Sequence, residues 1–173
     1  MPESAKRRKG PEAIGRDFAR AVSGEIVRAA TISHKEFMSR LRDLEKFYVH
    51  ELEGFPEFAL EVKRRVSEQL LEQAIFRRNS LSACRARLNA ASRLGFTNIE
   101  QRAHCHMLYA QYAFARGNKR VAKRIASALV IELEQSLRKR KSPLAKQCLT
   151  YARGFLDFID SANKALKRTP SHA

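Results

Sequence analysis

Five cationic side chains between positions 116 and 124 are spaced for anion binding. They are Arg116, Lys119, Arg120, Lys123 and Arg124. Four of them follow Gly117, where a helix is expected to begin, and cations there oppose the helix dipole at a cost of about a few tenths of a kcal/mol each. Stability alone would favour Asp or Glu. Because free backbone N–H groups beside converging Lys and Arg side chains bind anions, the sequence predicts an anion-binding surface here.

The positive charge of the chain is concentrated around these residues. The 173 residues have a net charge of +16, and residues 77–141 alone carry 15 basic and three acidic side chains. Repulsion among these charges costs stability, so a compensating partner is expected. If neighbouring helical hairpins stack side by side, four arginines extend the surface: Arg77, Arg78, Arg85 and Arg87. The alternative is a charged, solvated helix face without a partner.

The motifs of common catalytic and metal sites are absent from the sequence. Residues 117–120 lack the preceding glycine and the Ser or Thr of a phosphate-binding loop. His104 and His106 would lie about 200° apart around a helix and cannot share a metal ion. The three cysteines form no C-x-x-C pair. We therefore predict a protein that is not an enzyme and that has no cofactor and no metal site.

Helical periodicity runs through the chain from Pro11 to about Lys167. Predicted helix starts are capped by Ser33, Ser80, Thr97 and Ser142. Predicted stops lie at Gly54, Asn79, Gly95 and Gly117. Seven glycines and five prolines leave little turn material for a protein of many strands. The predicted fold is all-α, with about seven helices in antiparallel hairpins.

The expected helix from Asn98 to Arg116 differs from the others. Apolar or small side chains cover nearly its whole circumference, from Ala103 to Phe114. A helix that is apolar all round must be packed on several sides. We expect it to be the central helix of the domain.

Small residues in the hairpins from about 57 to 137 follow a regular spacing. Ala110, Gly117 and Ala122 are separated by seven and five residues, and Ala83 and Ala90 lie seven apart in the preceding hairpin. This pattern resembles tetratricopeptide (TPR)-like helical hairpins. The sequence departs from that family at Leu129, where a small residue is usual. A plain helical bundle is the alternative arrangement.

The resemblance implies a concave groove that binds an extended or helical peptide and performs no chemistry of its own. If it holds, the groove-facing residues are His104, Met107, Gln111 and Phe114.

The termini differ in composition from the helical region. Residues 1–10 predict a flexible basic arm, residues 11–167 a single all-helical domain, and residues 168–173 a disordered tail. The arm holds Lys6, Arg7, Arg8 and Lys9. No apolar run approaches the roughly 20 residues that span a bilayer. An odd number of widely spaced cysteines favours a reducing compartment, so we expect a cytoplasmic protein, or a nuclear one if the source is eukaryotic.

Two functions agree with these patterns. The first is a non-enzymatic helical adaptor that binds an acidic segment of a protein partner through its basic face. The second is a nucleic-acid-binding protein that contacts RNA or DNA phosphates without sequence specificity through the same surface. The chain has no tryptophan and no zinc-finger or RNP-type motif, so the first function is favoured. The sequence leaves the oligomeric state open.

Overall fold

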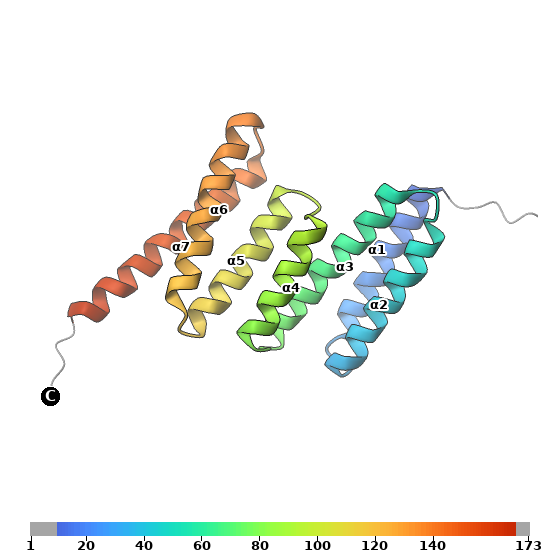
Figure 1. Cartoon of the computed structure of the whole chain (residues 1–173), viewed down its shortest axis with the longest axis horizontal. Coiled ribbons are helices and arrows are strands. Elements are labelled where there is room, and N and C mark those ends of the chain that lie inside the picture. Colours follow the sequence, from blue (N-terminus) through green and yellow to red (C-terminus); the bar gives the residue numbers. More distant parts are fainter. Residues whose placement is uncertain (1–9, 169–173) are drawn as a thin grey trace, which may run out of the picture. The chain divides into compact units, whose positions relative to one another are not determined.

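A computed structural model describes residues 10–168, and within them the chain forms helices without any strand (Figure 1). The helices are α1 (Pro11–Arg28), α2 (His34–Glu51), α3 (Pro56–Phe76), α4 (Leu81–Leu94), α5 (Ile99–Ala115), α6 (Lys119–Lys139) and α7 (Pro143–Arg168). The all-α prediction and its seven helices are confirmed. Lys6, Arg7, Arg8 and Lys9 of the predicted arm, and the predicted tail from residue 169 onward, lie outside the described residues.

Polar side chains cap several of the helices at their N-termini. The hydroxyl groups of Ser33, Ser80 and Ser142 each accept a hydrogen bond from the backbone N–H three residues on, at 3.1–3.2 Å. The prediction of Thr97 as a cap is wrong, because α5 begins one residue later than expected. Asn98 is the cap, and its side-chain oxygen accepts from the N–H of the third residue after it at 2.7 Å. Each such cap stabilises its helix by about 1 kcal/mol.

The chain divides within α3, between Leu70 and Leu71, into two compact units. The sequence predicts a single domain, and no sequence feature near these residues indicates the division. The first unit contains α1, α2 and the beginning of α3. The second contains the end of α3 and the helices α4 to α7.

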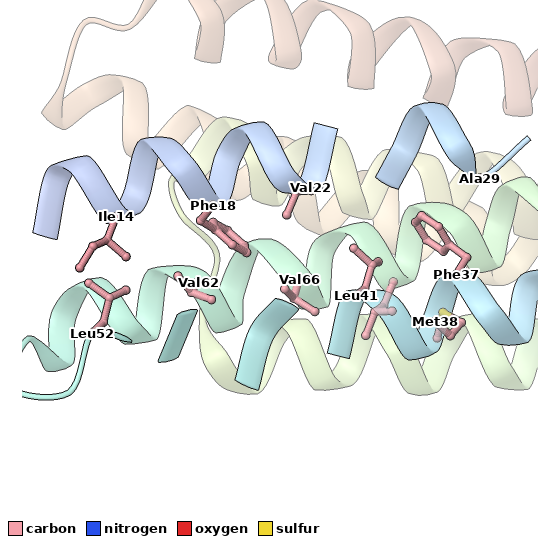
Figure 2. Close-up of a cluster of buried hydrophobic side chains, with 11 residues drawn as sticks. Ile14, Phe18, Val22, Ala29, Phe37, Met38, Leu41, Leu52, Val62 and Val66 are labelled. Carbon is pink, nitrogen blue, oxygen red and sulfur yellow. The ribbon is translucent and has the colours of Figure 1, made fainter. Parts of the chain in front are cut away.

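The first unit is held together by apolar side chains from all three of its helices. Ile14, Phe18 and Val22 point from α1 toward the other helices (Figure 2). Phe37 and Leu41 of α2 are fully buried in the same cluster. Burying a side chain of this size stabilises the fold by about 1.5–3 kcal/mol.

The second unit is built around α5. This helix contacts α4, α6 and α7, and Figure 1 shows α4 to α7 following one another as hairpins. Its buried residues cover more than half of its circumference and leave the side that carries His104 open: Ala103, Cys105, Met107, Tyr109, Ala110 and Ala113. The prediction that this helix is packed on several sides is confirmed. Small side chains make this possible, because they let neighbouring helix backbones approach closely.

Two turns of the second unit share one hydrogen-bonding pattern. After α3, the N–H of Arg78 donates to the Ile75 carbonyl, and after α5 the N–H of Gly117 donates to the Phe114 carbonyl, both at 2.9 Å. Arg78 has φ 54° and Gly117 has φ 81°. This left-handed conformation costs a non-glycine residue about 1–2 kcal/mol. Glycine is therefore favoured at this position of each turn. The turn after α5 has glycine there, as Gly117, whereas the turn after α3 has Arg78.

We predict that Arg78→Gly raises the free energy of unfolding by about 1 kcal/mol, because glycine adopts a positive φ without strain. Gly117→Ala is the matched variant and should lower it by about 1 kcal/mol. A Cβ at Gly117 would meet no atom within 4 Å, so the loss would come from the backbone conformation alone. Urea denaturation measures both changes. A lower stability of Arg78→Gly would contradict this account of the turn.

Candidate functional site

The five cations predicted around the start of α6 fall into two groups. Lys119 Nζ lies 5.9 Å from the centre of the Phe114 ring, and Lys123 Nζ forms an ion pair with Asp160 of α7. These two amino groups are held by neighbours. The other group consists of the exposed side chains of Arg116, Arg120 and Arg124. No carboxylate of residues 10–168 forms an ion pair with any of the three.

Tyr109 of α5 is influenced by one arginine from α4 and one from α6. Its ring is buried in a cluster with apolar side chains of both helices. Burial raises the pKa of the Tyr109 hydroxyl, while the positive charges of Arg85 and Arg124 act to lower it. Arg85 on α4 and Arg124 on α6 are both exposed, and the positive charge of each acts on this one buried hydroxyl group.

The remaining three arginines of the predicted surface differ in accessibility. Arg78 is exposed at the turn after α3. Arg77 and Arg87 are half-buried, and each already interacts with other residues of the chain. The hydroxyl of Tyr112 donates to the backbone carbonyl of Asn79, which holds the α3–α4 turn beside α5. Arg78 is therefore the member of this group that is open to a partner.

Carboxylates of the second unit are mostly engaged already. Glu72 pairs with His104 at 3.3 Å, Glu132 with Arg102 at 2.9 Å, and Glu134 with Arg153 at 2.7 Å. Glu100 accepts a hydrogen bond from the Ser142 hydroxyl at 2.6 Å, and Asp160 pairs with Lys123. Asp157 is exposed. The surplus of Arg and Lys is therefore not offset by the described acidic residues.

The four predicted groove residues do not share one open surface. Met107 is only 4% exposed and packs with α6 and α7, so its prediction as a groove residue is wrong. Phe114 is half-buried against Phe155 and Phe158 of α7. His104 is exposed beside Glu72, and Gln111 donates to the Tyr151 hydroxyl. The four residues do not form an open groove because α7 covers the side of α5 that carries Met107 and Phe114.

Burial of the alanines bears on the TPR resemblance, which stays a prediction. Ala110 and Ala122 are fully buried, as tight packing between the helices of a hairpin requires. Ala83 and Ala90 are exposed. In α4 the buried residues Cys84 and Ala91 each come one position after these alanines.

Three aromatic residues near the basic surface have no counterpart in the sequence prediction. The Tyr109 hydroxyl is affected by the charges of Arg85 and Arg124, the Tyr151 hydroxyl accepts a hydrogen bond from Gln111, and no local pattern distinguishes either from a core tyrosine. Phe158 is 56% exposed although its ring lies 5.4 Å from that of Phe114. Leu144, Tyr151 and Phe158 recur every seven residues and are all exposed, a spacing that could have signalled an open apolar row on α7.

The chain matches no protein-family model, no curated protein and no solved structure. Among residues 10–168, no three His, Cys, Asp or Glu side chains are placed to hold a metal ion. No helix in the described part of the chain is long and apolar enough to cross a membrane.

We predict that replacing both Arg85 and Arg124 with Gln raises the pKa of Tyr109 further above its ordinary value. Burial is the largest influence on this pKa and raises it, while the two guanidinium groups favour the charged phenolate, so their removal takes away the opposing effect. NMR titration of the labelled tyrosine ring measures the change. The control, Arg93→Gln with Arg138→Gln, removes two exposed arginines that do not act on Tyr109. A Tyr109 pKa that is equal in wild type and the double variant would refute the placement of these arginines.

Proposed function

We propose that this protein is a non-enzymatic helical interaction module that binds an acidic segment of a protein partner. The binding surface is the basic face, which we define as Arg85, Arg116, Lys119, Arg120 and Arg124. The observation that supports it most strongly is the set of exposed arginines on α4 and α6 without a carboxylate partner among the described residues. Arginine is well suited to this role, because its planar fork binds a carboxylate through two parallel hydrogen bonds.

The outer side of α6 favours a protein partner over a nucleic acid. Arg124, Ile131 and Arg138 are spaced seven residues apart on this helix, and all three are exposed. Ile131 is 57% exposed between the two arginines. An aliphatic side chain flanked by cations complements an amphipathic segment that carries both acidic and apolar residues. A nucleic acid makes little use of Ile131, since its phosphates are recognised by cations and its bases stack on aromatic rings.

We predict that a labelled acidic amphipathic peptide, with Glu on one face and Leu on the other, binds the wild-type protein. Arg120→Glu combined with Arg124→Glu should weaken this binding at least about tenfold, because each reversal replaces attraction by repulsion. The variant should keep its helicity and melting temperature, since both side chains are exposed and acidic residues near a helix start are favourable. Fluorescence anisotropy and circular dichroism measure the two properties.

The matched control is Lys35→Glu with Lys46→Glu, which makes the same change in net charge at exposed positions of α2. This control should bind the peptide within about twofold of wild type, since general attraction to a cationic protein is weak at physiological salt. Equal losses in both variants would contradict a specific basic face. Labelled single-stranded RNA and duplex DNA are tested between about 50 and 200 mM salt. Binding that persists at the upper salt concentration and is lost only in the α6 variant would replace this proposal with nucleic-acid binding.

A further inference from the structure

The end of α2 and the start of α3 form an acidic surface with exposed aromatic rings. Phe47 is 56% exposed, Phe55 44% and Phe58 37%. We call this surface the acidic turn, and it also contains the exposed side chains of Glu51, Glu53 and Glu57. Exposed aromatic side chains gathered in one place on a monomer commonly mark an interaction site.

Charges on the acidic turn are largely uncompensated. Glu53 lies 3.7 Å from His50, a pair that attracts only when the histidine is protonated. Glu51 and Glu57 form no ion pair with any Lys or Arg of the described chain. The nearest cation in sequence is Lys46, which is exposed. The acidic turn therefore carries both carboxylates and apolar rings, as the segment proposed to bind the basic face would.

The second unit carries a surface of the opposite sign, also with exposed aromatic rings. At the end of α3, Phe76 is 78% exposed. On α7, Phe158 contacts the Phe114 ring, over which the Lys119 amino group lies. We call this surface the basic end, and its cations are Arg78, Arg116, Lys119 and Arg120. The hydrogen bond from Tyr112 of α5 to the Asn79 carbonyl holds the turn after α3 beside α5.

We propose that the acidic turn of one copy of this chain docks on the basic end of a second copy. The carboxylates of Glu51, Glu53 and Glu57 would pair with the arginines, and the exposed phenylalanines of both surfaces would bury one another. This inference rests on the proposed function, since it names this chain itself as a source of the acidic segment. We choose a second copy of this chain as the partner for two reasons. The two surfaces have opposite charge, and both carry exposed phenylalanine rings.

The two surfaces are different, so the contact is heterologous. A dimer formed in this way still presents one free acidic turn, on one copy, and one free basic end, on the other, so association can continue beyond a dimer. The surfaces are small and charged, which is typical of weak, reversible contacts. Association should therefore increase with protein concentration and decrease with added salt.

Sedimentation velocity of the full chain tests this proposal. We expect the weight-average mass to rise at least about twofold between about 5 and 200 µM protein at low salt, and to fall again when salt is added. A mass that stays that of a monomer under all these conditions would overturn the inference. If the acidic amphipathic peptide still binds such a monomer through Arg120 and Arg124, the proposed function stands and only the self-association fails.

Charge-swapped variants test which surfaces meet. In one variant the acidic turn is reversed by Glu51→Lys, Glu53→Lys and Glu57→Lys. In the other the basic end is reversed by Arg116→Glu, Lys119→Glu and Arg120→Glu. Neither variant alone should associate, because each then presents two surfaces of like charge. An equimolar mixture of the two should associate, because opposite surfaces are available again.

The control for the first variant is Glu12→Lys with Asp43→Lys, which changes exposed carboxylates outside the acidic turn. This control should associate like wild type. A mixture that stays monomeric, or association that survives in either single variant, would show that these surfaces do not pair. Circular dichroism of each variant verifies that the helices are intact.

Discussion

Close packing of α5 on α6 through alanines is the constraint on which the second unit depends. Ala103 of α5 shares a buried cluster with Ala126 of α6, and Ala113 of α5 shares another with Ala122 of α6. Larger side chains at these positions would force the helices apart, at a cost of about 1–3 kcal/mol each. This contact fixes which side of α6 turns inward. The opposite side, with Arg120 and Arg124, is consequently left in solvent.

The same contact explains why the positive charge is not neutralised within the second unit. Residues of α6 that flank the alanine seam reach acidic or basic partners on neighbouring helices, as Glu132 does with Arg102 and Lys123 with Asp160. Arg120 and Arg124 on the outer side form no ion pair with a carboxylate of the described residues. Like-charged neighbours cost stability unless a partner compensates them. In the proposed function, the exposed Ile131 on the same side gives the partner an apolar contact between the cations.

Helix positions could be predicted from the sequence because caps, glycines and apolar periodicity are local signals. Ser33, Ser80 and Ser142 show this, and Thr97 fails only because Asn98 beside it caps equally well. Contacts between helices that are distant in the sequence cannot be predicted from local sequence patterns. Met107 was expected in a groove, yet α7 covers it, and Tyr109 gains its arginine neighbours from two other helices. The division inside α3 has no local signal either, because the helix continues through it.

Mapping of the peptide-binding surface by NMR tests the central claim most directly. Backbone amide shifts of the full chain are compared with and without the acidic amphipathic peptide. The account predicts that the largest changes fall on the first turns of α6 and on Arg85 of α4, with little change in α1. Shift changes confined to the first unit, or spread evenly over every exposed lysine and arginine, would contradict it.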